Sequence, residues 1–234
     1  MRQAILIFNK EFKDYFVSPI AYIVIALFLL VTGWLFFSTF FVYGQVELRR
    51  FFDLLPFLFA LVVPIITMRL FSEELNVGSY EILLTLPVTF NDIIIGKFLA
   101  GLAFVAAILL PTLSYPIFIS FLGDLDWGVV AGSYLGTILL GGAYVAIGLF
   151  ASSLTRNQII ACIVGMVICA VLAIIDKMLF FFPQSFLDIV AYLSAAIHFD
   201  NVAKGIVDTR DILYFLSIMF IGLYATHLVM HEKK

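Results

Sequence analysis

Charged side chains are scarce in this 234-residue sequence: they make up 12% of it, whereas hydrophobic residues make up 64%. A soluble domain carries about 25% charged residues. A globule of this length cannot bury such a surplus of apolar side chains, so lipid must cover part of them. The net charge of −3 is small and argues against nucleic acid as a main partner. The composition therefore predicts a membrane protein.

The sequence also has little of what catalysis or metal binding needs. Its two cysteines, Cys162 and Cys169, share one apolar run and are expected to be small core residues. The three histidines, His198, His227 and His231, have no convincing metal-ligand partner. No G-x-x-x-x-G-K-[ST] phosphate loop, H-E-x-x-H or G-x-S-x-G motif occurs, so we expect this chain to bind no cofactor or metal and to hydrolyse no ATP itself.

Six long apolar runs predict helices that cross a hydrocarbon layer of about 30 Å. They cover residues 20–42, 51–70, 91–121, 128–151, 157–175 and 212–229. Pro56 and Pro64 in the second run, and Pro111 and Pro116 in the third, predict kinks or bends. In the fourth and fifth runs small residues recur at every fourth position, which favours close helix packing within the chain or across a dimer. The expected fold is an all-α membrane protein with six transmembrane helices.

Polar residues at the ends of the runs predict where helices begin. Ser, Thr, Asn and Asp side chains accept hydrogen bonds from the first free N–H groups of a helix. The candidates are Ser18, Thr89 or Asn91, and Asn157, and a capping pair is formed by Asp208 and Asp211.

Residues 2–16 predict a helix that lies flat on the membrane surface. Phe12 and Phe16 fall on an apolar arc, and Lys10 and Lys13 fall on the opposite arc, toward lipid headgroups. No cleavable signal peptide is evident, so the first span is expected to stay as an anchor.

Residues 184–205 contain an apolar stretch, 186–199, that is too short and interrupted for a span. A re-entrant or surface-lying hairpin fits them, provided that its backbone is buried in protein. Just before them, Asp176 marks either a proton or ion path or, with Lys177, an interfacial pair, and the second interpretation is favoured.

The longest polar interruption in the first half of the chain lies between the second and third runs. Residues 72–87 predict a short amphipathic helix that does not span, but lies on the membrane surface or docks into another protein. Its charges come from Glu73, Glu74 and Glu81, and the helix-breaking residues Gly78 and Pro87 interrupt and end it. Six spans place both termini on one side, and a modest excess of Lys and Arg assigns that side to the cytoplasm, together with this segment and Arg156.

The run FSEELNVGSYEILLTLPVTFNDIIIGK at 71–97 resembles the first cytoplasmic loop of type 2 ABC-transporter permeases, which docks onto the ATPase subunit. The opening KEFKDYFVSPIAY at 10–22 is similar to the interfacial helix and first span of the same family. Residues 198–215 are similar to the gliding-motility-associated ABC permease of Bacteroidota. The resemblance extends from the interfacial helix to the last span.

This resemblance implies a single permease domain over 1–234 in a bacterial inner membrane. It implies a separate ABC ATPase subunit that carries ATP and Mg, and a second permease copy or a homologous membrane subunit with a periplasmic domain. The work done would be export, or gliding- or secretion-related. Matched position by position, the ATPase-coupling contacts would be Glu73, Glu74, Gly78, Glu81, Pro87, Arg156 and Asn157.

Other interpretations stay open from the residues alone. A secondary transporter or channel needs intramembrane ionisable residues or broken-helix repeats, which are not clear here. An intramembrane enzyme needs a buried catalytic pair. A non-transporting anchor that performs mechanical work or signalling would use the same coupling segment. The glutamates of residues 72–87 fit a solvated helix face as well as a docking contact.

Overall fold

The computed structural model describes residues 2–43, 48–79, 88–123, 125–178, 192–205 and 208–233. Every regular element within these ranges is a helix, which confirms the all-α class. In chain order the helices are α1 (Arg2–Val17), α2 (Pro19–Tyr43), α3 (Arg49–Thr67), α4 (Arg69–Val77), α6 (Phe90–Leu109), the 3-10 turn η1 (Pro111–Leu113), α7 (Ser114–Ser120), α8 (Trp127–Leu154), α9 (Gln158–Ile174), α11 (Ala195–Ala203) and α12 (Thr209–Glu232).

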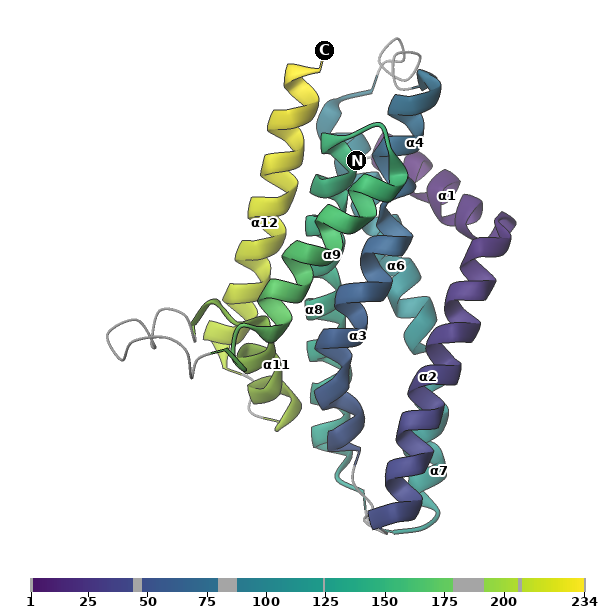
Figure 1. The fold of residues 1–234 in the computed structure, drawn as a ribbon, viewed down its shortest axis with the longest axis vertical. Coiled ribbons are helices and arrows are strands. Elements are labelled where there is room, and N and C mark those ends of the chain that lie inside the picture. Colours follow the sequence, from purple (N-terminus) through teal and green to yellow (C-terminus); the bar gives the residue numbers. More distant parts are fainter. Residues whose placement is uncertain are drawn as a thin grey trace.

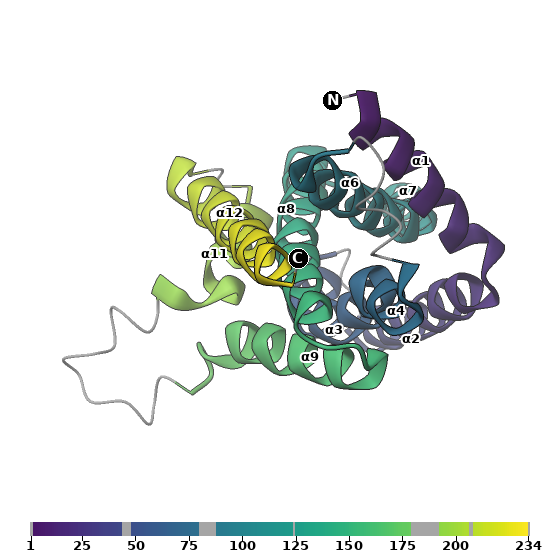
Figure 2. The ribbon, with the colours of Figure 1, turned by 90° about the horizontal axis from the view of Figure 1, so that it is seen from above.

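Helix α8 is the centre of the bundle (Figures 1 and 2), and α12, α9, α3, α11, α6 and α4 all contact it. Its small residues let these neighbours come close. A Cβ added at Gly141 would lie 2.6 Å from Val105 of α6, and one at Gly142 would lie 2.6 Å from Met219 of α12. The small residues of the fourth run therefore serve packing inside one chain.

Five helical stretches among the described residues are long and apolar enough to cross a membrane. They are Pro19–Ser38, Phe51–Val77, Phe90–Ser120, Trp127–Leu154 and Thr209–Glu232. The fifth expected span coincides with α9, which is apolar but only 17 residues long. The chain is thus a multi-pass helical protein, and its sixth crossing stays a prediction.

The two proline-containing spans are interrupted at different places. The third span changes to 3-10 geometry at Pro111, before α7 continues to Ser120, as its length and prolines predict. The second span keeps Pro56 and Pro64 inside α3 and breaks only after Thr67, where α4 begins.

The outer helices present apolar side chains to their surroundings. Trp34 of α2 is 74% exposed and Phe220 of α12 is 70% exposed, values that suit contact with lipid rather than with water. Helix α1 does not continue the direction of α2 but lies across one end of the bundle, next to α6 (Figures 1 and 2).

The helix caps predicted at Thr89, Asn157 and Asp208 are present. Thr89 Oγ1 accepts a hydrogen bond from the backbone N–H of Asp92 at 3.3 Å, and Asn157 Oδ1 accepts one from Ile159 at 2.9 Å. Asp208 caps α12 in the same way. Each cap satisfies N–H groups that a helix leaves free at its start.

The capping role predicted for Asp211 is wrong. Its carboxylate turns inward, and its Oδ1 lies 2.5 Å from Nδ1 of His198, while Nε2 of His198 lies 3.0 Å from the carbonyl oxygen of Tyr192. Both side chains are almost fully buried, so the carboxylate is committed to the histidine rather than to the start of α12.

The second half of the expected 184–205 hairpin is described, and it ends in α11, a helix that packs against α8, α3, α12 and α9. Residues 184–191 lie outside the described residues. Beside α11, Asp176 and Lys177 line a hollow of about 330 Å³ together with Asp53 and Asp200.

Candidate functional site: the joint between α3 and α4

The break between α3 and α4 is buried, and side chains from other helices bind its backbone. Helix α3 ends at Thr67, and α4 begins at Arg69. Ser152 of α8 donates a hydrogen bond to the carbonyl oxygen of Met68 at 2.7 Å and accepts hydrogen bonds from the N–H groups of Phe71 and Ser72, both at 3.0 Å. A side chain inserted into a helical hydrogen-bond ladder is a known cause of a kink. We call residues 66–72 the α3–α4 joint.

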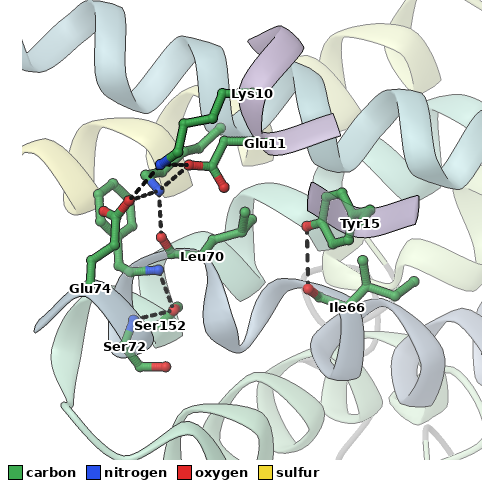
Figure 3. A network of polar contacts seen from close by, with 10 residues as sticks. Lys10, Glu11, Tyr15, Ile66, Leu70, Ser72, Glu74 and Ser152 are labelled. Carbon is green, nitrogen blue, oxygen red and sulfur yellow. Dashed lines mark hydrogen bonds and ion pairs between the residues drawn. The ribbon is translucent and has the colours of Figure 1, made fainter. Parts of the chain in front are cut away.

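Two further helices bind the joint (Figure 3). From α1, the Tyr15 hydroxyl donates to the carbonyl oxygen of Ile66 at 3.3 Å. From α6, the Lys97 ammonium donates to the carbonyl oxygen of Leu70 at 2.7 Å. The carbonyl oxygen of Ile66, in the last turn of α3, is thus paired as a buried helix end requires, and that of Leu70, in the first turn of α4, gains an additional donor.

Lys97 is the buried charge at the centre of this site. Its ammonium lies 2.9 Å from Glu11 Oε1 of α1 and 2.8 Å from Glu74 Oε1 of α4, and its side chain is 1% exposed. With the bond to Leu70, all three of its N–H donors are used. An unpaired ammonium at this depth would be costly, whereas two carboxylates and a carbonyl compensate it. Lys97 therefore ties α6 to α1 and α4.

Lys10 completes the charge cluster from the solvent side. Its ammonium lies 3.5 Å from Glu11 and 3.9 Å from Glu74. Partial burial lowers the pKa of Lys10, but the carboxylates of Glu11 and Glu74 outweigh this and raise it overall. Two cations and two carboxylates thus balance one another in the cluster.

Gly96 lets α1 approach α6 closely enough for this contact. A Cβ at this position would lie 2.8 Å from the carbonyl oxygen of Ala4 and 2.9 Å from the side chain of Ile7. These distances are shorter than real Cβ contacts, so a larger residue would displace α1. Gly96, next to the buried lysine, is therefore a close packing contact for α1.

The apolar arc of α1 packs mostly against protein. Phe12 and Phe16 are half-buried against the core, and Phe16 lies 5.7 Å from the ring of Phe104 in α6. Lys10 and Lys13 are exposed on the other side. The predicted helix is thus present, and its position at a membrane surface stays a prediction.

The predicted coupling residues divide into outward and inward groups. Glu73 is exposed on α4, whereas Glu74 points inward to Lys97. Gly78 ends α4 with a left-handed φ of 77°, a conformation that glycine adopts without strain. Glu81 and Pro87, and with them the segment 80–87 of the expected coupling helix, lie outside the described residues. A hollow of about 430 Å³ between α1 and α4 is lined by Glu73, Glu74 and Arg69, among others.

The turn between α8 and α9 lies next to the joint because Ser152 belongs to the last turn of α8. Arg156 is exposed in this turn, while the Asn157 side chain caps α9. Lys233 donates to the carbonyl oxygens of Ser153 at 2.6 Å and Leu154 at 3.2 Å, which satisfies the C-terminal end of α8. Burial lowers the pKa of Lys233, and the neighbouring Arg156 lowers it further.

The most connected residues of the site carry only weak signals in the sequence. A lysine several positions inside an apolar helix is costly in lipid and so points to a partner, which would have singled out Lys97. In the sequence, Ser152 is one of several residues of the polar turn at 152–157, and nothing local distinguishes it from its neighbours. Among the described residues, no group of three His, Cys, Asp or Glu side chains is placed to hold a metal ion. The cluster is suited to holding helices in register.

A comparison with protein families matches residues 5–219 to the family described as ABC-2 family transporter protein. Among curated proteins, none matches the chain. The matched region includes α1 from Ile5 onward, the joint, the α8–α9 turn and the first half of α12, up to Met219.

Proposed function

The chain belongs to the ABC-2 family of transporter proteins, and from this premise we propose that it is the permease subunit on which a separate ABC ATPase docks. The docking end is the one that holds α1, α4 and the α8–α9 turn, which we call the α4 end. The ATPase subunit would carry the ATP and Mg. The observation that carries this proposal is the α3–α4 joint, where one spanning helix continues into a short polar helix bound by three neighbours.

Glu73 and Arg156 are the proposed contacts to the ATPase among the described residues. Both are exposed, and Ser152 connects α4, which carries Glu73, with the last turn of α8, which precedes Arg156. Glu74 and Asn157 have internal roles, since Glu74 binds Lys97 and Asn157 caps α9. Glu81, Gly78 and Pro87 complete the proposed coupling segment.

The proposed mechanism follows from these contacts. Closure of the ATPase around ATP pushes α4, and the joint passes this movement to α3 directly and to α1, α6 and α8 through Tyr15, Lys97 and Ser152. A packed bundle rearranges between discrete arrangements rather than deforming smoothly. A path would then open at the interface with a second membrane subunit, or force would pass to a periplasmic partner.

The proposed setting is a bacterial inner membrane crossed six times, with both termini in the cytoplasm. Helix α9 would supply the sixth crossing, and the exposed lysines of α1 would meet lipid headgroups. A second copy, or a homologous subunit with a periplasmic domain, would complete the permease. The work done is export or gliding-related movement, and the likeness of residues 198–215 to gliding permeases supports the latter.

The test is a pull-down of the tagged chain from native membranes, followed by mass spectrometry. We expect a P-loop ATPase to be retained, and the Glu73→Lys variant to retain at least about tenfold less, as a loss of about 1.4 kcal/mol would cause. The matched control is Asp53→Lys, which reverses an exposed carboxylate in the first turns of α3, away from α4. A chain that is eluted alone would point to a secondary transporter, and equal retention by both variants would remove Glu73 from the contact.

A further inference from the structure

Ser152 occupies the place of a missing piece of helix. In an unbroken helix the N–H group of Phe71 would bind the carbonyl oxygen of Thr67, four residues earlier. The helix is broken there. The Ser152 hydroxyl accepts hydrogen bonds from the N–H groups of Phe71 and Ser72 and donates one to the carbonyl oxygen of Met68. One hydroxyl thus makes three hydrogen bonds with the joint.

These bonds are protected from water. Ser152 is 0% exposed, and so is Ser72, while Phe71 is 1% exposed. Water cannot replace the hydroxyl at such a depth, so its loss would leave two backbone N–H groups and a carbonyl oxygen with fewer partners. The bonds therefore fix α4 to the last turn of α8 more firmly than surface contacts of the same number would.

The two helices fixed in this way, α4 and α8, hold the two proposed ATPase contacts. Helix α4 carries Glu73, and the turn after α8 carries Arg156, two residues beyond the end of that helix. We propose that Ser152 is a positioning residue that makes α4 and the α8–α9 turn one rigid unit, so that the ATPase meets a single preformed surface rather than two independent loops. The role assigned to this rigid unit rests on the proposed function, whereas its rigidity can be measured on the chain alone.

A preformed surface has a physical advantage in docking. Two contacts that are already held in register avoid the free-energy cost of ordering loops and side chains on binding. It also means that a push on either contact moves both α3 and α8, because the joint lies between them.

The experiment measures the distance between α4 and the end of α8 by double electron–electron resonance. Spin labels are placed at Asn76 and Leu154, which are both exposed, after Cys162 and Cys169 are replaced by alanine. The whole chain is studied in lipid nanodiscs, first alone and then with the ATPase that the pull-down retains, with and without ATP. The variants are Ser152→Ala, Ser152→Thr, which keeps a hydroxyl, and Ser153→Ala as the matched control.

Ser153 is a suitable control because it is equally buried, while among the described residues its hydroxyl donates to the carbonyl oxygen of Phe150 in its own helix, at 2.7 Å, and not to the joint. We expect one narrow distance distribution in the unsubstituted chain and in Ser153→Ala, and the same mean distance with and without ATP. Ser152→Ala should broaden the distribution, and Ser152→Thr should restore it at least in part.

Two results would overturn the proposal. One is a distance in the unsubstituted chain that changes when ATP is added to the complex, since α4 and the turn would then move separately. The other is a Ser152→Ala distribution as narrow as that of Ser153→Ala. If Ser152→Ala does not fold, the distance measured in the unsubstituted complex with and without ATP still tests whether α4 and the turn move as one unit. The measurement on the chain alone stands even if no ATPase is retained, so failure of the proposed function is recognised separately.

Discussion

Two buried clusters of titratable side chains lie in different parts of the bundle and connect its helices in different ways. At the α4 end, Lys97 joins residues from three helices, and its partners Glu11 and Glu74 lie 86 and 23 residues away in the chain. Beside α11, which Figure 1 shows in the lower half of the bundle, His198 and Asp211 join neighbouring helices 13 residues apart. The first cluster holds together helices that meet a proposed partner, whereas the second closes a local corner. The proposed transmission of movement needs connections between distant helices, which the first cluster supplies.

The largest effect is expected from Lys97→Met. The substitution leaves the carboxylates of Glu11 and Glu74 buried without their main cation, which costs about 3–5 kcal/mol for a broken buried pair. The midpoint of thermal unfolding in detergent should fall well below that of the original chain, and retention of the ATPase should fall with it.

Two companion variants sharpen this result. Lys97→Arg keeps the charge and should lose less stability. Adding Glu11→Gln and Glu74→Gln to Lys97→Met removes the uncompensated charges and should recover part of the loss. An unfolding midpoint that does not respond to Lys97→Met would show that the charge at the α4 end does not stabilise the fold.

At the other cluster, His198→Phe should cost about 3 kcal/mol, because the buried Asp211 carboxylate then loses its short contact and keeps the longer 3.5 Å hydrogen bond from Asn201. The same unfolding measurement gives this value. The prediction that separates the two clusters is that retention of the ATPase, per folded molecule, stays at its original level. A loss of retention equal to that of Lys97→Met would break the comparison.

Gly96→Ala should have the next largest effect, because the added methyl group meets the backbone of α1. Overpacking of this kind costs about 1–3 kcal/mol. The matched variant is Gly136→Ala beside α11, where the closest atoms, at 3.0 Å and 3.3 Å, belong to the side chain of Val202 and can shift more easily. Unfolding midpoints should rank Gly136→Ala above Gly96→Ala, and the reverse order would show that α1 is loosely seated.

The smallest effect is expected from Asn157→Ala. The substitution removes the cap of α9 and should cost about 1 kcal/mol of stability. The Asn157 oxygen is already bound to the N–H group of Ile159, so ATPase retention should change much less than in Glu73→Lys. If retention falls as far as in Glu73→Lys, Asn157 is a direct contact as well as a cap.

The elements could be predicted from the sequence because membrane spans and caps depend on local patterns. The runs around α2, α8 and α12 follow from apolar length alone, and Thr89, Asn157 and Asp208 follow from cap chemistry. The site could not be predicted in the same way. Ser152 and the joint are 80 residues or more apart, and no local pattern shows which distant backbone groups a hydroxyl will bind. Asp211 was misassigned for the same reason, since His198 reaches it from another helix.

The joint also has a consequence for the order of events during synthesis. A chain enters the membrane from its N-terminus, so α3 and α4 are made well before Ser152 exists. Until α8 arrives, nothing separates Thr67 from Phe71, and we expect the ladder to close across residues 66–72 as one straight helix. The break between α3 and α4 would then be imposed late, when the central helix packs into place, and the nascent chain would not hold the proposed docking surface until α8 has been inserted.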